Sequence, residues 1–421
     1  MFSFVVGVGV VQLVAATSAY HNPFSTSPIC TASPVADICL RTQSTLEEAR
    51  NDSDSLLFRY ESWVQVGACH NLNGENFCAF SNPSFNRGQG ISVITTPESI
   101  TKIAYRTAFK NATITENIRT PSESPVPYHV AQFPGKGFGL VTTRSLRDGE
   151  LVMSRTPAVM VNAKAVSNLG RDHLADLLRN GIESLSSEHK SQYLNLSTHD
   201  EVAAYEEKVY KIFKTNSFRT GAHDGESEFH STFTEVSRLN HDCRPNCAYY
   251  FDHTIFAHRV IAVRDITPGE ELTISYYDPL QPSSKRRQRL SQDWGFTCSC
   301  KSCTAGAQQI AESDKRIEEV HQLWKELDDY TSNSKATPEK AERLVQLYKQ
   351  EGIYGRLHEA YYRAAVEWIG VGNAGKAAEH AGRCIDRGRI FRGPDRPFIK
   401  NMEKLIVDPE GYPGWKFRLK S

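Results

Sequence analysis

The sequence lacks a net charge, and beyond its first twenty residues it lacks any long apolar run. Its 49 basic residues balance 49 acidic ones, so the composition gives no reason to expect nucleic-acid binding. No later segment approaches the roughly 18 apolar residues of a membrane helix, and we expect no membrane span. A length of 421 residues predicts two or three structural units. We expect a monomer.

The N-terminus holds the one extended apolar run, which is too short to cross a bilayer comfortably. Residues 1–19 predict a signal peptide, with small residues near Ala19 suited to cleavage, although the usual positive start is missing. A buried or disordered N-terminal strand is the alternative. We therefore expect the secretory pathway or an extracellular location, with the nucleus or cytoplasm as the alternative. Glycosylation acceptor tripeptides, compatible with secretion, begin at Asn51, Asn111 and Asn195.

The ten cysteines fall into groups that indicate different chemistry. Four occur early, and in an oxidising compartment they could form two disulfides in three possible pairings. These four are Cys30, Cys39, Cys69 and Cys78. The sequence around them is rich in turn-forming residues, which predicts a small module over residues 29–120. Closely spaced prolines and serines in TPSESPVP then indicate a linker.

The rest of the chain divides by hydrophobic pattern. From Tyr128 to Val161, β-branched runs alternate with turn signals, and strand character returns in AYYFDH, TIFAHRVIAV and ELTISYY. Between these stretches, residues 163–213 show helical spacing and predict a helical insert. Residues 305–421 are helical and polar, and contain a hairpin about a glycine turn. Such a hairpin is typical of tetratricopeptide-like arrays, but an ordinary helical bundle also fits.

The segment RLNHDCRPNC, residues 238–247, packs donors, acceptors and a possible metal ligand just before a predicted strand. By itself it could be a polar loop that caps its own backbone. The later segment CSCKSC brings Cys298, Cys300 and Cys303 within six positions. Three thiolates do not close a tetrahedral structural zinc site, so a fourth ligand is needed, and Cys243 is the candidate. A disulfide plus one free thiol is the alternative.

Two further motifs add to this pattern. In GEELTISYYD a turn leads into a predicted strand ending in Tyr276 and Tyr277, of which only one can face a given pocket because neighbouring strand residues point to opposite faces. In FPGKGFGL three glycines allow the backbone to approach a ligand closely. Alone, a glycine-rich turn is a weak signal, since no helix follows to bind a phosphate.

In this order and spacing, the four motifs resemble those of SET-domain lysine methyltransferases. GKGFGL is similar to the first cofactor loop of that family, NHDCRPN to its knot-forming motif, GEELTISY to its catalytic strand and GFTCSCKSC to its post-SET zinc segment. The arrangement looks most like the SET-and-MYND type. However, the insert after Val161 contains no cysteine, so no MYND finger can form there.

The resemblance implies an α+β fold. Its expected parts are a β-rich SET domain with a pseudoknot over residues 128–280, including the helical insert, then a post-SET zinc segment over residues 281–304 and an all-α C-terminal region. The small Cys-containing module would precede them. The implied zinc ligands are Cys243, Cys298, Cys300 and Cys303.

The implied activity is transfer of a methyl group from S-adenosylmethionine to a protein lysine. Cofactor contacts are implied for Lys136, Gly137, Phe138, Asn216, Asn240, His241, Phe296 and Tyr276. Tyr276 would face the transferring methyl group, and Trp294 would line the lysine channel with it. The large indole predicts low methylation states. The partner would be a lysine-containing protein or peptide. A non-catalytic, secreted SET-like binding module is the competing hypothesis, because the predicted signal peptide fits poorly with a cytosolic cofactor.

Overall fold

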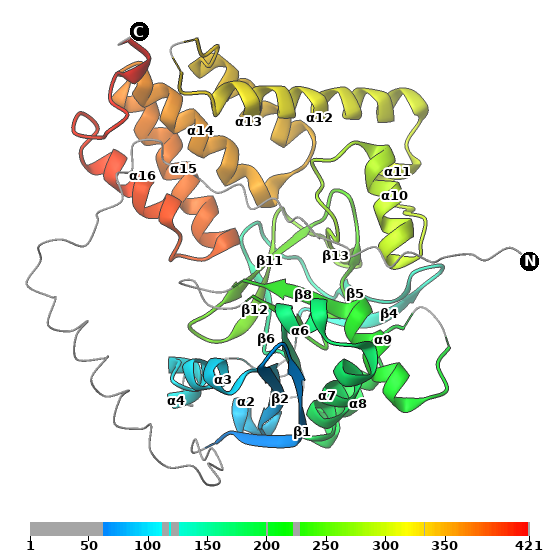
Figure 1. Cartoon of the computed structure of the whole chain (residues 1–421). Helices are drawn as coiled ribbons and strands as arrows, with labels where there is room; N and C mark the ends of the chain where they lie inside the picture. Colours follow the sequence, from blue (N-terminus) through cyan, green and yellow to red (C-terminus); the bar gives the residue numbers. More distant parts are fainter. Residues whose placement is uncertain are drawn as a thin grey trace, which may run out of the picture.

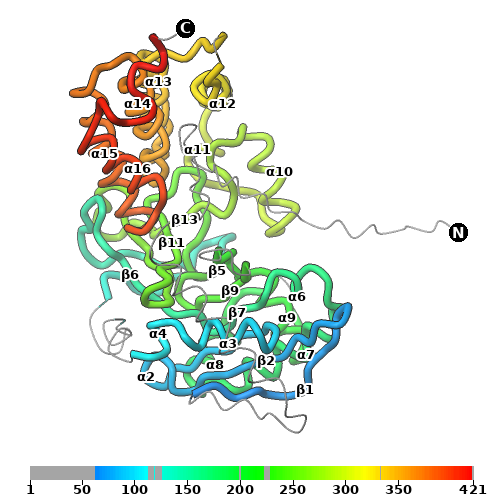
Figure 2. The backbone as a smooth tube through the Cα atoms, turned by 60° about the vertical axis from the view of Figure 1, so that its left-hand side comes forward, coloured from blue at the N-terminus to red at the C-terminus, as the bar shows by residue number. Residues whose placement is uncertain are grey.

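The computed structural model describes residues 62–111, 118, 126–198, 201–221, 228–331 and 333–419. The predicted signal peptide, Cys30, Cys39 and Asn51 lie outside these residues. The described chain is α+β, as predicted. The C-terminal helices gather at one end, a strand-rich body occupies the middle, and the first strands lie at the other end beside a second group of helices (Figures 1 and 2).

The largest sheet joins the N-terminal module to the predicted SET region. Its strand order is β1 (Val64–Leu72), β2 (Glu75–Asn82), β3 (Ile91–Thr95), β7 (Val159–Asn162), β9 (Phe229–Thr232) and β8 (Ser217–Thr220). Every residue of β3 is buried, as expected for a strand with neighbours on both edges. Because β3 pairs in parallel with β7, the sheet crosses the boundary predicted between residues 29–120 and 128–280.

A disulfide closes the hairpin of β1 and β2. Cys69 and Cys78 lie on opposite strands with their Cα atoms 4.3 Å apart and their sulfurs bonded. This bond belongs to one of the three pairings that the sequence allows for the four early cysteines. Short helices follow the hairpin: α2 (Phe85–Gly88), α3 (Pro97–Ala104) and α4 (Thr107–Lys110).

Two smaller sheets form the centre of the molecule. One has the order β10 (Asn240–His241), β13 (Glu271–Ile274), β5 (Gly137–Thr142) and β4 (Tyr128–Phe133); the other has the order β11 (Cys247–Asp252), β12 (Ala257–Ala262) and β6 (Leu151–Arg155). The strands predicted from hydrophobic alternation are therefore present. One detail differs, because β13 ends at Ile274 and both tyrosines lie beyond the strand.

The predicted insert is helical. It consists of α6 (Ala163–Asn168), α7 (Arg171–Glu183), α8 (Ser187–Leu194) and α9 (Tyr205–Asn216). Ser186 starts α8 as an N-cap, because its side chain accepts a hydrogen bond from the backbone N–H of His189 at 3.2 Å. The apolar faces of α7 and α9 bury Leu177, Leu178 and Phe213 in a core shared with the large sheet.

The predicted helical region, residues 305–421, is helical over its described residues, and two further helices, α10 and α11, lie before it in the predicted zinc segment. The main helices of the two regions are α10 (Ser283–Trp294), α11 (Lys301–Thr304), α12 (Ala307–Leu327), α13 (Pro338–Gln350), α14 (Leu357–Gly370), α15 (Ala374–Arg392) and α16 (Pro397–Val407). The predicted hairpin is formed by α14 and α15, which pack together. Gly372 allows the tight turn between them, with a φ of 78° that favours glycine.

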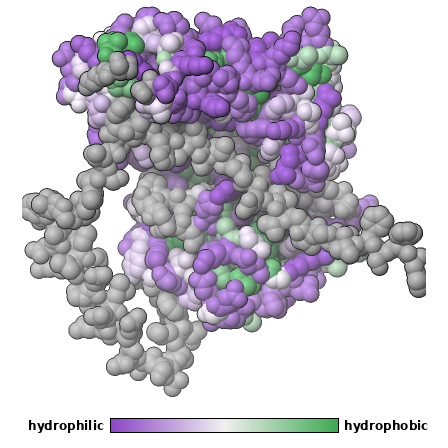
Figure 3. All heavy atoms as spheres, turned by 45° about the horizontal axis from the view of Figure 1, so that its top comes forward, coloured by the Kyte–Doolittle hydropathy of each residue, from purple (hydrophilic) through white to green (hydrophobic). Residues whose placement is uncertain are grey.

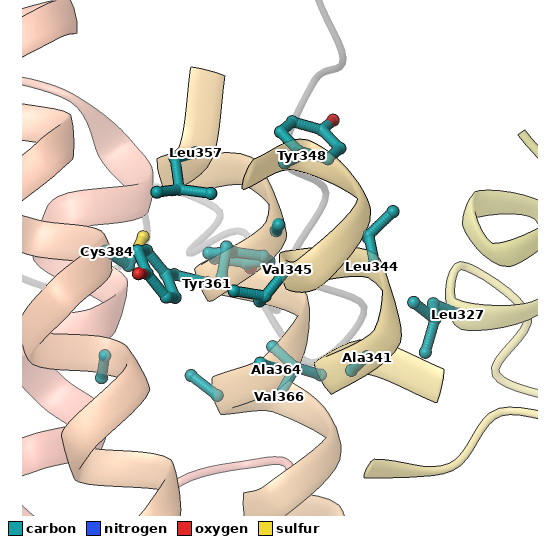
Figure 4. Close-up of a cluster of buried hydrophobic side chains, with 14 of the residues drawn as sticks. Leu327, Ala341, Leu344, Val345, Tyr348, Leu357, Tyr361, Ala364, Val366 and Cys384 are labelled. Carbon is teal, nitrogen blue, oxygen red and sulfur yellow. The ribbon is translucent and has the colours of Figure 1, made fainter. Parts of the chain in front are cut away.

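A continuous apolar core holds these helices together. Leu344 and Tyr348 of α13, Ala364 of α14 and Cys384 of α15 are buried in it (Figure 4). On the face shown in Figure 3, the surface at this end is mostly hydrophilic, with a few apolar residues among the polar ones. Within the described residues, no helix is both long enough and apolar enough to cross a membrane.

Ion pairs join the helical region to the strand-rich body. Glu351, after α13, pairs with Arg244 of the RLNHDCRPNC segment. Arg356 pairs with Asp278 at 2.7 Å, just after the tyrosines. Both ion pairs reach segments that carry predicted site residues. The helical region therefore helps to hold these segments in place.

Candidate active site

A cleft of about 1380 Å³ lies between the insert, the small sheet of β5 and β13, and the segment after α10. All nine residues predicted to contact cofactor or substrate line it: Lys136, Gly137, Phe138, Asn216, Asn240, His241, Tyr276, Trp294 and Phe296. These residues come from five separate stretches of sequence. The fold thus gathers the predicted positions around one cavity.

The glycine-rich turn forms one edge of the cleft. Gly135 and Gly137 have φ values of 72° and 73°, in the left-handed region that favours glycine. Gly139 is required for a different reason. A β-carbon there would lie 2.6 Å from Nδ2 of Asn240 and 2.8 Å from the ring of Phe133. The turn and the Asn240 segment can therefore approach each other only because residue 139 has no side chain.

Glu271 of β13 fixes two predicted cofactor residues. Its Oε1 accepts a hydrogen bond from Nδ2 of Asn240 at 2.9 Å, and its Oε2 pairs with Nζ of Lys136 at 2.7 Å. Since one carboxylate binds both side chains, it holds the glycine turn next to the RLNHDCRPNC segment, residues 238–247, which is called the knot segment below. No described residue donates to Oδ1 of Asn240, which leaves that oxygen as an acceptor at the cleft wall.

Asn216 is already engaged by the protein. Its Nδ2 donates to the backbone oxygens of Ser197 and Ile212, both at 2.8 Å, and its own backbone oxygen accepts from Ser237. Asn216 therefore fixes the end of α9 against the loop after α8. These hydrogen bonds hold the wall of the cleft that is formed by the end of α9 and the loop after α8.

Tyr276 is held by two hydrogen bonds. Its hydroxyl donates to the backbone oxygen of Leu239 at 2.8 Å, and its backbone N–H donates to Nδ1 of His241 at 3.0 Å. The surrounding protein raises the pKa of the phenol above its usual value, because burial disfavours phenolate. The hydroxyl is consequently neutral, and its remaining lone pair is free to face the cleft.

His241 connects this tyrosine to the cysteines. Burial lowers its pKa to about 4, so the ring is neutral near pH 7. Because Nδ1 accepts from Tyr276, the proton of the neutral ring must be on Nε2. Nε2 lies 3.4 Å from Sγ of Cys243, and the tautomer makes it the donor. Such a bond suits a thiolate at Cys243 and fixes the ring, as a second layer around a metal does.

Aromatic rings line the same wall. The Trp294 ring centroid is 5.5 Å from that of Tyr276, and the Phe296 ring stands edge-on to Tyr276 at 6.4 Å. Phe138, which also lines the cleft, is 57% exposed, which is unusual for so large an apolar side chain. An apolar ligand surface lying in the cleft would cover it.

Four cysteines meet beside the cleft. The sulfurs of Cys243, Cys298, Cys300 and Cys303 all lie within 4.8 Å of one another, and all four residues are buried as free thiols. The alternative of a disulfide among them is therefore not realised. In a tetrahedral zinc site with Zn–S bonds of about 2.3 Å, sulfurs are about 3.8 Å apart. Cys243 and Cys303 are 3.6 Å apart, so the donor set fits one such ion.

Two arginines of α10 flank the thiols. Arg286 is 1% exposed, and its guanidinium interacts with the sulfur of Cys243. Arg287 donates to the backbone oxygen of Cys303. Four thiolates around a divalent cation leave two net negative charges, and buried cations beside them offset this excess. The arginines fit that role, which the sequence analysis did not identify.

Tyr249 and Phe218 also line the cleft, although no motif in the sequence pointed to either residue. Their rings are 5.2 Å apart and nearly perpendicular. AYYFDH was interpreted only as a strand, because three consecutive aromatics give no indication of which one reaches a pocket. Gly139 was noted in the glycine motif, but its close contact with Asn240 depends on tertiary structure.

Comparison with known proteins agrees with this geometry. The SET-domain profile matches residues 137–277. Histone-lysine N-methyltransferase SMYD3 of Homo sapiens is 40% identical over 106 residues, which are 22% of this chain and 24% of that protein. N-lysine methyltransferase SMYD2 of Mus musculus is 29% identical over 187 residues, 44% of this chain and 40% of that protein. Histone-lysine N-methyltransferase set5 of Schizosaccharomyces pombe is 23% identical over 310 residues, 69% of this chain and 87% of that protein.

The matched segments span less than half the length of the SMYD2 and SMYD3 relatives. The profile begins at Gly137 and ends at Tyr277. It thus covers the residues of the cleft from Gly137 to Tyr276, but not Lys136 or the segment that carries Trp294 and Phe296. Residues 137–277 therefore match the SET domain, and through this region the chain is similar to protein-lysine methyltransferases.

Proposed function

We propose that the protein transfers a methyl group from S-adenosylmethionine to the side-chain amine of a protein lysine. One observation carries the proposal: nine residues expected at cofactor and substrate line a single cleft. The bound cofactor would supply an electrophilic methyl group on a sulfonium. Lys136, Asn240 and His241 would hold it at the glycine turn and the knot segment.

The residues of this chain would act chiefly by positioning. Methyl transfer requires the amine, methyl carbon and sulfur in line, and correct alignment supplies much of the rate. The aromatic rings of Tyr276 and Trp294 would favour the neutral, nucleophilic form of the lysine, because an apolar surrounding lowers the amine pKa. The Tyr276 hydroxyl donates to Leu239, so its other lone pair can accept a weak C–H contact from the methyl group.

The four buried thiols would bind one zinc ion, which would have a structural role. A site with four protein ligands is closed to water and substrate. Because Cys243 lies next to His241, and Cys298 follows Phe296 by two positions, the ion would connect two walls of the cleft. Zinc would thus order the cofactor site without taking part in the transfer.

Trp294 would limit the number of methyl groups added. Its indole is larger than a tyrosine or phenylalanine ring and lies 5.5 Å, centroid to centroid, from the Tyr276 ring. We expect mono- and dimethyl-lysine as products, because the narrowed channel leaves little room for a trimethylated amine. Mass spectrometry of a methylated peptide measures this directly, and accumulation of trimethyl-lysine by the wild-type protein would contradict it.

A reducing compartment, such as the nucleus or cytoplasm, would suit the active protein better than the secretory pathway. Four thiols in one site favour reducing conditions. The acceptor Asn195 is exposed and lines the cleft, so a glycan there would obstruct it. The Cys69–Cys78 disulfide is the opposing observation. A mobility shift of the cellular protein after peptide N-glycosidase treatment would contradict this proposal.

Transfer of an isotope-labelled methyl group tests the activity. The full chain, purified with zinc, would be incubated with labelled S-adenosylmethionine and a library of lysine-containing peptides. Label should appear on lysine, and Tyr276→Phe should reduce the rate by about 100-fold through loss of alignment while cofactor binding stays within a few-fold. Cofactor binding by the wild type without transfer to any peptide or protein extract would favour the non-catalytic hypothesis.

A further inference from the structure

A second cavity of about 450 Å³ lies between the SET domain and the helical region. Its walls come from β11 and β12 on one side and from the end of α15 and the turn before α14 on the other. Tyr249 and Arg219 line both this cavity and the large cleft. The two cavities therefore share a wall at Tyr249 and Arg219, which places the second cavity next to the large cleft.

The second cavity has an unbalanced positive charge. It is lined by Arg219, Arg356, Arg392 and Arg396 but by only one carboxylate, that of Glu228. Arg219 pairs with Glu228, and Arg356 pairs with Asp278 and Glu359. Among the described residues, Arg392 and Arg396 form no ion pair with a carboxylate, although the neighbouring Asp395 attracts Arg396. Nε of Arg396 donates to the backbone oxygen of Arg392 at 2.7 Å.

These two guanidiniums lie at a site where an anion would be stabilised. Arg392 is exposed and Arg396 is partly buried. A carboxylate can bind two guanidiniums by charge-assisted hydrogen bonds, which are stronger than neutral ones. The apolar parts of the cavity, Tyr250 and Phe391 among them, suit the non-polar stem of a peptide side chain. A peptide with acidic side chains matches this wall better than a neutral or basic one.

We propose that this cavity selects the substrate: Arg392 and Arg396 bind aspartate or glutamate next to the target lysine, which enters the cleft past Tyr249. The inference rests on the proposed methyl transfer, but it also predicts binding that can be measured without turnover. Complementary charge mainly increases the association rate and the discrimination between partners. The preference should accordingly weaken as ionic strength rises.

The test compares peptide pools that share a central lysine and differ in the flanking residues. One pool carries Asp and Glu, a second carries Gln, and a third carries Lys and Arg at the same positions. Binding is measured by fluorescence anisotropy and methylation by label transfer, with the zinc-loaded full chain. The wild type should prefer the acidic pool to the Gln pool by roughly 3- to 10-fold, the size expected for exposed charge pairs.

Variants with matched controls identify the residues responsible. The double variant Arg392→Gln, Arg396→Gln should bind the acidic and Gln pools equally. Charge reversal in Arg392→Glu, Arg396→Glu should reverse the order and favour the basic pool, which destabilisation alone would not produce. The control is Arg389→Gln, also on α15, because Arg389 is exposed, pairs with Glu403 and does not line the cavity. It should keep the wild-type preference.

Three results would overturn the proposal: no preference in the wild type, an unchanged preference in the double variant, or displacement of the peptide by duplex DNA that depends on Arg392 and Arg396. The last result would make the arginines nucleic-acid contacts. A different result is possible: the acidic pool binds in a way that depends on the two arginines, but no pool is methylated. This result would support peptide binding at the cavity and contradict the methyltransferase proposal. The two failures are thus distinguishable.

Discussion

The lack of a side chain at Gly139 allows Asn240 to take its position in the wall of the cleft. An added β-carbon would lie 2.6 Å from Nδ2 of Asn240, so Gly139→Ala should push that side chain away from Glu271. We expect the dissociation constant for S-adenosylmethionine to rise about tenfold, equivalent to about 1.4 kcal/mol. Titration calorimetry measures it.

Gly382→Ala is the control for this substitution. Gly382 lies within α15, and a β-carbon there meets no atom within 4 Å. That variant should bind cofactor normally and should be slightly more stable, because alanine favours a helix. Equal cofactor affinity in the two alanine variants would show that the contact of Gly139 with Asn240 is unimportant.

We expect His258 to lower the free energy of unfolding in acid. It is 1% exposed, stacks on Phe233 with ring centroids 3.9 Å apart, and burial lowers its pKa to about 3. The unfolded state binds a proton below its ordinary pKa of 6.5, whereas the folded state does not. The free energy of unfolding is therefore highest above pH 6.5, the ordinary pKa of histidine. It falls as the pH decreases toward 3, and the loss from His258 is about 2 kcal/mol at about pH 5.

Urea denaturation at about pH 7 and about pH 5 tests this expectation. His258→Phe keeps the aromatic stacking and has no proton to bind, so its free energy of unfolding should depend less on pH than that of the wild type. Release of zinc in acid affects both proteins and cancels in the comparison. The same pH dependence in the two proteins would show that His258 does not contribute.

At this scale, the sequence predicted residues that belong to distinctive motifs and did not predict those defined by packing. Asn240, His241 and the four cysteines stand in short, chemically dense segments, so their roles could be expected. Arg286 and Tyr249 lie in ordinary helical and strand patterns. Their place beside the thiols and the cleft depends on contacts between segments distant in sequence, which no local pattern records.

Glu351 is the point at which the helical region holds the knot segment. It is 5% exposed, pairs with Arg244, and accepts from Nε of Arg316 at 2.5 Å and from Oγ of Ser313 at 2.7 Å. Glu351→Gln would leave two arginines without their counter-charge. We expect the protein to be destabilised by about 3 kcal/mol, the usual cost of removing one partner of a buried pair.

Glu379→Gln is the matched change at the surface. Glu379 pairs with Arg383 on α15, and both side chains are about half exposed, so its loss should cost no more than about 0.5 kcal/mol. Because Arg244 follows Cys243, Glu351→Gln should also weaken cofactor binding, whereas Glu379→Gln should not. Equal free energies of unfolding for the two variants would show that Glu351 is not a structural tether.

Individual elements were more predictable than their pairing. The run YHVAQF forms β4 over the predicted residues, and helical spacing located the insert and the hairpin of α14 and α15. The pairing of β3 with β7 joins residues far apart in sequence, and alternation reveals a strand but not its neighbour. The N-terminal hairpin was therefore expected as a separate module, although its sheet is continuous with the rest.

For the whole molecule, the arrangement makes three parts depend on one another. The thiol cluster lies beside the cofactor cleft, the helical region supports the knot segment, and the second cavity opens between the helical region and the sheets.

The metal content of the purified protein tests whether the four thiols form one zinc site. The purified chain should carry one zinc per molecule, and Cys300→Ser should lose it, because three thiolates do not complete a closed site. A Cys384→Ser variant, altered at a buried thiol outside the cluster, should keep the metal.

Calorimetric titration of S-adenosylmethionine into the zinc-loaded chain, before and after removal of the metal by a chelator, tests the central claim most directly. The cleft and thiol cluster predict one binding event per chain, lost with the metal and restored when zinc is returned. Absence of binding to the zinc-loaded protein would contradict the assignment of the cleft. Equal binding with and without zinc would contradict the proposed coupling between the thiol site and the cofactor site.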